Sequence, residues 1–428
     1  MEELIEAPVR EYSARVEAAW FGDAAGVVPL HGEACSREPS RRMQAARGAS
    51  LGARFMTLWS MSSRAWFSGA AMFALLSATS VALCAEPIVL AQSLPLTGAG
   101  FTASTRIVAG TTAAVDAFNR SGGIAGRQVR LETVDDADDP SRTAANLRRL
   151  ANEVHPVAFL NCVGTPACAA AASVARSTQI PLIGPMSGAP ALRSMPDTPV
   201  YCIRPDVTLE ATSIASQLKS LGVSSVAILT DHPASDHRSE ILSEALRRKG
   251  LKPSVVRTAP AAMGESLKRT SYATAILIDL DLQGAEALGE LPAQALEERP
   301  QLIASLATPG LATIIRLFPK RVIGFTAVVP QPELPNSPLV RGLLRDSEQI
   351  GPDAMTYEGL EAYVSTLVAL EAIRRAGPRA DARTVAVEMA RLGHIELGQF
   401  PLTFSRPGRS ASEWVDIALR ARNGVLLR

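Results

Sequence analysis

The sequence has almost no excess of charge of either sign. Its 43 Lys and Arg residues nearly balance its 42 Asp and Glu residues, which gives a formal net charge of +1. It also lacks a long basic run and any pattern of basic residues interleaved with aromatic ones. Such features produce the positive surface that attracts nucleic acid or an anionic membrane. The sequence therefore predicts no nucleic-acid partner.

The chain also lacks the short motifs of common catalytic and metal sites. It contains no P-loop, no dinucleotide fingerprint and no Gly-x-Ser-x-Gly elbow. Ser235-Asp236-His237 has the residue types of a catalytic triad, but adjacency in sequence does not give triad geometry. His232 and His237 are not at a metal-site spacing, and the acidic segment 135–139 lacks the glycine and glutamate of a calcium loop. We therefore predict neither an enzyme nor a metal or cofactor site.

A segment near the N-terminus has the pattern of a secretion signal. Residues 61–85 begin with basic Arg64, continue with an uncharged apolar run over 66–83 and end in small residues at Ala85. The run is rich in Ser, Thr, Gly and Ala, which favours a cleaved signal peptide over a retained anchor. Lipid attachment at Cys84 is less favoured because Leu83 is bulky. The sequence thus predicts a periplasmic protein without stable membrane insertion after cleavage.

Residues 1–60 precede this signal, although an export signal acts at the N-terminus. We predict that they are a non-native or disordered extension.

Cysteine is scarce. The chain has five cysteines, and the first two precede the predicted mature start at Glu86. In an oxidising compartment the remaining three allow one disulfide, most easily Cys162–Cys168. Three buried thiols, with Cys202 as the third, are an equally good interpretation.

Short apolar runs alternate with helical patterns along the mature chain, which indicates βα units and parallel sheets. The predicted strands are 88–94, 129–134, 156–161, 181–184, 225–230, 254–258, 273–279, 321–329, 400–404 and 415–419. The predicted helices are 102–119, 141–153, 167–177, 209–221, 238–249 and 357–376. The sequence therefore predicts an α/β fold with two halves.

Six segments in order along the mature chain resemble a known family. They are Ser93-Leu94-Pro95-Leu96-Thr97-Gly98, residues 118–126 (FNRSGGIAG), residues 135–140 (DDADDP), residues 180–185 (IPLIGP), residues 357–363 (YEGLEAY) and Leu402-Thr403-Phe404. The chain resembles type I periplasmic substrate-binding proteins, in particular the leucine/isoleucine/valine-binding branch that serves ABC transporters.

The resemblance implies two doubly wound parallel-sheet lobes joined by three crossovers, near 204–207, 326–330 and 400–404. Lobe 1 would comprise 86–205 and 329–399, and lobe 2 would comprise 206–328 and 400–428. A solute would bind between the lobes, at the carboxyl ends of strands. Hinge closure would then present it to an ABC permease.

Two loops are candidates for holding a ligand carboxylate. Pro166 marks a helix start, where free backbone N–H groups favour an anion, so Gly164 and Thr165 lie at a possible anion site. The resemblance implies that Thr165 helps hold the carboxylate, although it could also simply cap the helix. It also implies a second carboxylate loop with Ser187 and the backbone of Met186 and Gly188. A plain turn is the alternative for this loop.

The resemblance further places Phe101 near a position where the family often has an aromatic lid, with a core residue as the alternative.

The sequence departs from the family on the lobe 2 side. Segment 230–238 lacks the Tyr-Gly that would cover the ligand, with Ser235 near its place, and segment 304–307 lacks the acid that would pair with an ammonium group. Asp281 could replace that acid, or it could be a solvated loop residue. A branched-chain amino acid is therefore one candidate ligand, and an aromatic or aliphatic acid without an amine is another.

These observations predict a periplasmic solute-binding protein of an ABC importer that performs no chemistry. The alternatives are a sensor that signals ligand occupancy to a separate partner, and a paralogue that has lost solute binding.

Overall fold

The computed structural model describes residues 86–428 except 196, 293–300, 309, 319–322, 421–425 and 428. All of the described residues belong to one compact unit. The predicted extension at 1–60, the predicted signal peptide at 61–85 and Cys84 lie outside the described residues and stay predictions.

The first sheet is parallel and has the strand order β2-β1-β3-β4-β5. Strand β1 pairs with β2 and β3, so that Leu90 lies beside both Leu131 and Ala158. The strands are β1 (Ile88–Leu94), β2 (Val129–Asp135), β3 (Ala158–Leu160), β4 (Leu182–Ile183) and β5 (Val200–Tyr201). Every residue of β1 is buried, as expected for a strand with helices on both faces.

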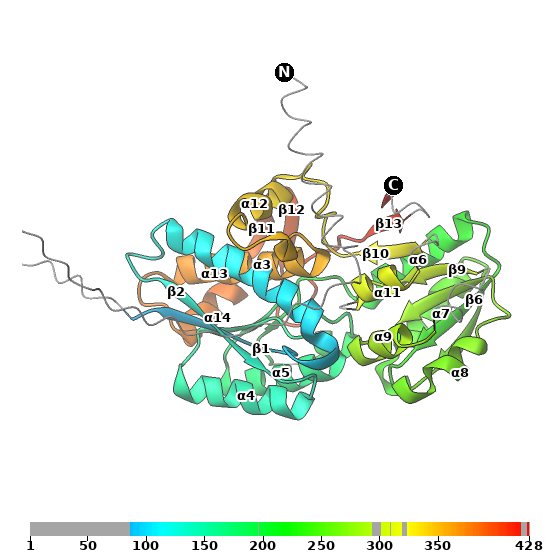
Figure 1. Cartoon of the computed structure of the whole chain (residues 1–428). Helices are drawn as coiled ribbons and strands as arrows, with labels where there is room; N and C mark the ends of the chain where they lie inside the picture. Colours follow the sequence, from blue (N-terminus) through cyan, green and yellow to red (C-terminus); the bar gives the residue numbers. More distant parts are fainter. Residues whose placement is uncertain are drawn as a thin grey trace, which may run out of the picture. The chain divides into compact units, whose positions relative to one another are not determined.

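Two helix layers cover this sheet (Figure 1). Helices α3 (Phe101–Arg120) and α13 (Tyr357–Ala376) lie on one face, and α4 (Pro140–Glu153) and α5 (Thr165–Thr178) lie on the other. The sheet is therefore doubly wound, although α13 comes from a part of the chain far from the strands that it covers.

The second sheet has the strand order β14-β13-β10-β9-β8-β6-β7. The five strands from β10 to β7 are parallel, whereas β13 and β14 are antiparallel. Its strands are β6 (Ser225–Thr230), β7 (Lys252–Arg257), β8 (Ala275–Asp279), β9 (Leu302–Ser305), β10 (Ile323–Ala327), β13 (Asp416–Arg420) and β14 (Leu426–Leu427). Its helices are α6 (Val207–Ser220), α7 (Arg238–Arg248), α8 (Met263–Lys268), α9 (Leu282–Gly289) and α11 (Leu311–Leu317).

Alternating residues of β8 show that this sheet is also covered on both faces. Ala275 and Leu277 belong to the apolar cluster of α6 and α7. Ile276 and Ile278 belong to the cluster that contains residues of α8, α9 and α11. Side chains of a strand point to opposite faces in turn, so these two clusters lie on opposite sides of the sheet. The predicted α/β class with parallel, doubly wound sheets is confirmed.

The remaining elements follow the second sheet's β10 in sequence or connect strands and helices. They are α12 (Pro338–Asp346), α14 (Ala382–Ala390), the hairpin of β11 (Gly393–Leu397) and β12 (Phe400–Phe404), and the short 3-10 helices η1 (Gly98–Gly100), η2 (Pro190–Arg193), η3 (Ala234–Asp236), η4 (Pro260–Ala262) and η5 (Pro352–Ala354). Within the described residues, the chain passes between the sheets after β5, after β10 and between β12 and β13.

The first two passages agree with the predicted crossovers near 204–207 and 326–330. Residues 400–404, predicted as the third crossover, form β12, which pairs with β11; the chain enters the second sheet only at β13. The exact lobe boundaries stay a prediction.

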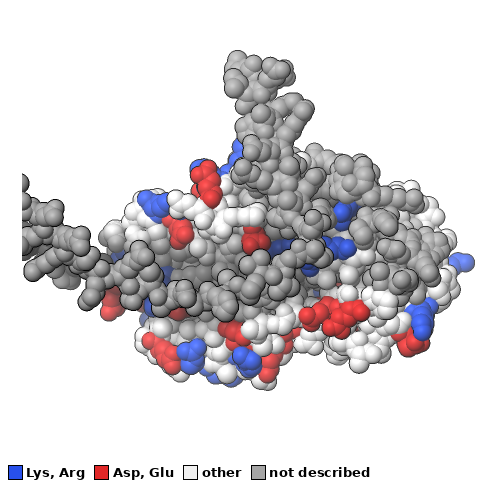
Figure 2. All heavy atoms as spheres, viewed as in Figure 1, with Lys and Arg blue, Asp and Glu red and all other residues white. Residues whose placement is uncertain are grey.

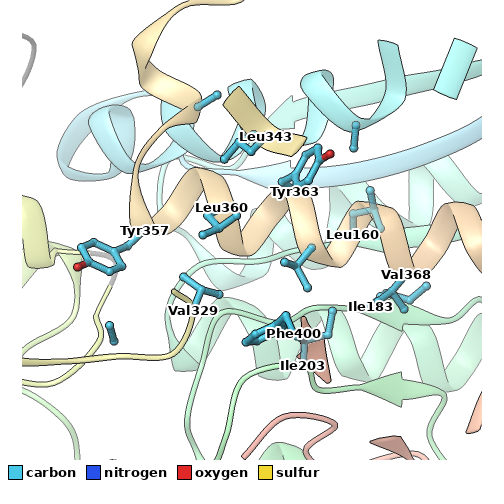
Figure 3. Close-up of a cluster of buried hydrophobic side chains, with 14 of the residues drawn as sticks. Leu160, Ile183, Ile203, Val329, Leu343, Tyr357, Leu360, Tyr363, Val368 and Phe400 are labelled. Atoms are coloured by element: carbon cyan, nitrogen blue, oxygen red, sulfur yellow. The ribbon is translucent and has the colours of Figure 1, made fainter. Parts of the chain in front are cut away.

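Helix α13 forms the centre of the largest apolar cluster. Its side chains Leu360, Tyr363 and Val368 lie among residues of several other elements, including Leu160 of β3 and Ile183 of β4 (Figure 3). The sequence predicted one apolar stripe on this helix, but the helix is buried on nearly all sides over its first turns, including Glu358 and Glu361. A helix buried all round is surrounded by protein rather than lying at its surface.

In the described part of the chain, no helix has both the length and the hydropathy needed to span a bilayer. On the face drawn in Figure 2, basic and acidic residues are interspersed over the described surface, in keeping with the near-zero net charge.

Helices α3 and α13 approach each other closely at two glycines. A Cβ atom on Gly110 of α3 would overlap the backbone carbonyl of Gly359 of α13. A backbone carbonyl cannot rotate away as a side chain can, so a larger residue would push the helices apart. This contact therefore fixes the distance between α3 and α13 at this point.

We expect Gly110→Ala to lower the free energy of unfolding by about 1–3 kcal/mol, because overpacking outweighs the helix propensity that alanine adds. The matched control is Gly289→Ala in α9, where the nearest atom to the new Cβ is 3.6 Å away. That control should be neutral or stabilising by up to about 1 kcal/mol. Urea unfolding of both variants measures the difference, and equal effects would contradict the proposed close contact.

Candidate functional site

The first part of the site is the loop that connects β3 to α5. Gly164 has a positive φ of 78° and directly precedes α5, which begins with Thr165 and Pro166. The first amides of a helix have no intrahelical acceptor, so this end of α5 presents N–H groups and the positive end of the helix dipole. Cys162 and Cys168 form a disulfide across the same loop, as predicted for the most easily formed pair. The third cysteine, Cys202, is free and buried.

The second loop follows β4 and lies against the first. Met186 pairs with Val163 in an isolated parallel bridge, and its N–H donates to the Cys162 carbonyl over 3.1 Å. The hydroxyl oxygens of Thr165 and Ser187 are consequently 3.0 Å apart. The N–H of Ala189 also donates to the Ser187 hydroxyl over 3.2 Å. Two hydroxyl groups from separate loops therefore meet at the start of α5.

Residues of the second sheet face these loops. A Cβ on Gly164 would lie 3.5 Å from Asp281 Oδ1, and a Cβ on Gly188 would lie 3.4 Å from Arg238 Nη1. The structure thus brings together six predicted residues from both halves: Gly164, Thr165, Met186, Ser187, Gly188 and Asp281. Their roles in ligand binding stay a prediction.

Phe101 is the first residue of α3 and is 58% exposed, so it is not a core residue. The preceding Gly100 lies close to Leu282, because a Cβ there would be 3.1 Å from Leu282 Cδ1. Phe101 is therefore near the residue that follows Asp281, and its predicted role as a lid is untested.

Asp281 occupies the N-cap position of α9 without a side-chain hydrogen bond to the helix, and its side chain is 27% exposed. Burial raises the pKa of Asp281 to about 6; Asp231 and Asp279 add to this effect, whereas His232 and Arg238 oppose it. An environment that favours the neutral acid is also one in which a bound cation would stabilise the charged form. The same group of residues, Asp231, His232 and Asp281, has a geometry that could hold a metal ion.

Arg238 and Asp279 form a buried ion pair behind this wall of the site. Arg238 Nε lies 3.4 Å from Asp279 Oδ2, and its Nη2 contacts the other carboxylate oxygen. Burial alone would raise the pKa of Asp279, but Arg238 and His232 outweigh burial and lower it. Asp279 is therefore ionised and its charge is neutralised within the protein.

Sequence reasoning missed Glu210, a buried acid that lies against segment 304–307, where the sequence itself has none. The Glu210 carboxylate accepts a hydrogen bond from the Ala307 N–H over 3.0 Å and another from Thr326 Oγ1 over 2.6 Å. The residue comes from α6, not from the segment after β9. One signal could have found it: Glu210 is spaced three and four residues from Val207 and Ile214, on the buried face of the helix.

Sequence reasoning also missed Arg204, which lies in the first connection between the sheets. Its guanidinium donates to both carboxylate oxygens of Glu361 on α13, over 2.8 and 2.7 Å, and to the Ala307 carbonyl over 2.9 Å. Both charged side chains are almost completely buried. Arg204 therefore joins the helix layer of the first sheet to the loop after β9 in the second.

A small cavity lies beside this pair, with a volume of about 20 Å³. Its wall includes residues from both halves, among them Met186, Arg204, Ala307, Thr308, Thr326, Tyr357 and Glu361. This space holds roughly one water molecule. A solute would therefore need the two halves to move apart before it could enter here.

We expect Glu361→Leu to lower the free energy of unfolding by about 3–5 kcal/mol, because it leaves the buried Arg204 charge without its partner. The double variant Arg204→Met, Glu361→Leu should recover much of this loss, since neither charge is then buried. The control is Arg149→Ala, which removes an exposed ion pair with Glu153 and should change stability little. Urea unfolding distinguishes the cases; a single variant as stable as the control would refute the role given to the pair.

A family model described as periplasmic binding protein matches residues 87–418. No curated protein matches this sequence. Solved structures with the same fold include a substrate-binding periplasmic protein from Ralstonia solanacearum, with a TM-score of 0.70 and 23% identity over 79% of this chain and 99% of that one.

Two further structures have solutes in their descriptions. A branched-chain amino acid ABC transporter protein from Thermus thermophilus with bound valine has a TM-score of 0.66 and 16% identity, over 80% of this chain and 94% of that one. A fatty acid ABC transporter substrate-binding protein from Thermomonospora curvata has the same TM-score and identity, over 80% and 92%. At these identities the likeness shows the fold alone.

Proposed function

Because this chain belongs to the periplasmic binding protein family, we propose that it is the solute-binding component of an ABC importer and captures a small carboxylate-bearing solute. The matched region, residues 87–418, contains every residue of the candidate site. The protein itself would perform no chemistry. Its signal peptide, predicted at 61–85, would direct it to the periplasm, where a permease collects the solute.

The observation that carries this proposal is the meeting of two hydroxyls at a helix start. Thr165 Oγ1 and Ser187 Oγ lie 3.0 Å apart at the first residue of α5. Each hydroxyl can donate to a carboxylate oxygen, and the first amides of α5 add further donors and a favourable dipole. In the absence of a solute the two hydroxyls satisfy each other, so a carboxylate would replace a contact that already exists.

The opposite wall is compatible with two kinds of carboxylate ligand. Asp281 lies close enough to Gly164 to receive an ammonium group from an amino acid bound at Thr165. A carboxylic acid without an amine would not pair with Asp281, whose carboxylate could then bind a different cation. The solutes named for the two relatives above, valine and a fatty acid, both carry a carboxylate, which supports the shared class.

We expect solute entry to need a change of conformation, since Ser187 is only 4% exposed. Opening of the two halves would expose Thr165 and Ser187, and closure on the solute would bury it. A hinge motion of this type gives a permease two states to distinguish.

A thermal-shift screen tests the proposed ligand class. Amino acids, aromatic acids, aliphatic acids and dicarboxylates are added separately to the protein, with the corresponding amides and amines as controls. A ligand that binds only the folded state raises the free energy of unfolding, by about 2.7 kcal/mol at 100 times its Kd, and so raises the melting temperature. We expect carboxylates to stabilise and their amides not to. Stabilisation by amines alone would refute a carboxylate solute.

The double variant Thr165→Ala, Ser187→Ala should weaken binding of the best carboxylate by about 10- to 100-fold, because two hydrogen bonds to a charged group are lost. Its matched control, Thr212→Ala with Ser216→Ala, removes two hydroxyls of α6 that bond only to carbonyls of their own helix. Isothermal titration calorimetry gives the affinities, and melting of the free protein checks that both variants fold. Equal affinities in the two double variants would remove Thr165 and Ser187 from the site.

A further inference from the structure

A compact group of acidic residues surrounds one histidine at the carboxyl ends of β6 and β8. These strands are parallel neighbours, and Thr230 at the end of β6 pairs with Asp279 at the end of β8. The loops that follow them are therefore side by side, and they bring Asp231 and His232 next to Asp281. We propose that these three residues bind a divalent transition-metal ion such as Zn²⁺, and that Asp236, which contacts His232 but lies outside this group of three, joins them as a fourth ligand.

The distances around the imidazole suit a metal better than hydrogen bonds. His232 Nδ1 is 3.4 Å from Asp281 Oδ2 and also 3.4 Å from Asp236 Oδ2. Ligand atoms bound about 2.1 Å from a tetrahedral Zn²⁺ are about 3.4 Å from one another. One ligand atom each from Asp231, His232 and Asp281 lies within 4.8 Å of the others, so small side-chain rotations would complete the site.

Asp236 provides an independent sign that a ligand is missing. Its side chain is only 10% exposed, and its Oδ2 atom is buried without a hydrogen-bond partner. The other oxygen, Oδ1, accepts from the Arg238 N–H over 2.8 Å, which holds the carboxylate in place. Oδ2 is thus fixed toward His232 Nδ1, a nitrogen that can donate one proton and so satisfy only one of its two acidic neighbours. A cation in this position would satisfy both.

The balance of charge leads to the same conclusion. Asp279 is paired with Arg238, which also lies near Asp281, whereas His232 is the residue around which Asp231, Asp236 and Asp281 are grouped. Asp138, from the loop after β2, adds a further negative charge near Asp231. Several enclosed carboxylates without enough cations are costly, and a divalent ion supplies the missing positive charge.

The groups behind the cluster have the arrangement that orients metal ligands. The second ring nitrogen of His232, Nε2, is 3.6 Å from Asp279 Oδ1. The backbone N–H of His232 donates to Thr230 Oγ1 over 3.2 Å. A carboxylate behind a metal-binding imidazole is a common feature of zinc sites. The Asp231 carboxylate is likewise held, because its Oδ1 accepts from the Asp281 N–H over 3.0 Å.

The mixed donor set favours a transition metal over Ca²⁺ or Mg²⁺, which prefer oxygen ligands alone. The sequence predicted no metal site because His232 and His237 lack a metal-binding spacing. That reasoning considered pairs of histidines in one segment, whereas these ligands come from two separate loops. The inference does not rest on the proposed solute, since the metal alone is the probe.

The test is titration of the full chain with Zn²⁺ after removal of metals by chelation. Isothermal titration calorimetry should show a Zn²⁺ site that Asp236→Asn and Asp281→Asn each weaken by more than about tenfold. The control is His237→Asn, an exposed histidine that contacts Glu240 and should not alter the affinity. Unchanged Zn²⁺ affinity in both Asp→Asn variants, or no binding by the unmodified protein, would overturn the proposal.

A second measurement on the unmodified protein does not depend on the folding of variants. Co²⁺ in place of Zn²⁺ should give visible absorption bands of nitrogen and oxygen coordination, without the intense near-ultraviolet band of a cobalt–thiolate bond. A thiolate band would place the metal on a cysteine and refute the site. Without metal, the melting temperature of the Asp236→Asn variant should equal or exceed that of the unmodified protein, because one of several like charges is removed.

Discussion

The buried ion pair of Arg204 and Glu361 is the contact on which the candidate site depends. Arg204 lies in the first connection between the sheets, Glu361 lies on the central helix α13, and a third hydrogen bond runs from Arg204 to the Ala307 carbonyl. One side chain thus links the helix layer of the first sheet to a loop of the second. Because a buried charge without a partner is costly, the connection has one strongly preferred position relative to α13. The loop bearing Ser187 precedes this connection in the chain, and the helix bearing Glu210 follows it.

The site is built where parallel strands end. Thr165 and Ser187 follow β3 and β4 of the first sheet, while His232 and Asp281 follow β6 and β8 of the second. Ligand sites in open α/β sheets are found at such carboxyl ends, because loops from neighbouring strands converge there. The first wall offers hydroxyls and amides, and the second offers carboxylates. The arrangement therefore favours a ligand that carries a negative group at one end and a positive group at the other.

Much of the fold followed from local patterns in the sequence. The apolar run 88–94 coincides with β1, and the predicted helix 357–376 coincides with α13. The strands β5 and β9 and the helices α12 and α14 were missed. Shortness alone is not the reason, since the equally short β3 and β4 were predicted within the apolar segments 156–161 and 181–184. The loop with Gly164 and Thr165 was singled out because glycine, proline and a hydroxyl residue mark a helix start, whereas the loop with Ser187 was singled out by the family resemblance; the roles of both stay a prediction. Glu210 and Arg204 were not found, since their partners are distant in sequence and only the fold brings them together.

The close approach of Gly110 and Gly359 also has a consequence for how the chain acquires its structure. All five strands of the first sheet are complete by Tyr201, yet α13, one of the two helices that cover the same face of this sheet, begins only at Tyr357. During synthesis the part of this apolar face that α13 covers stays exposed while the parallel strands of the second sheet are made. Contacts between such distant residues form slowly, and exposed apolar surface promotes aggregation in the meantime. A nascent chain of this design would benefit from a chaperone until α13 has docked.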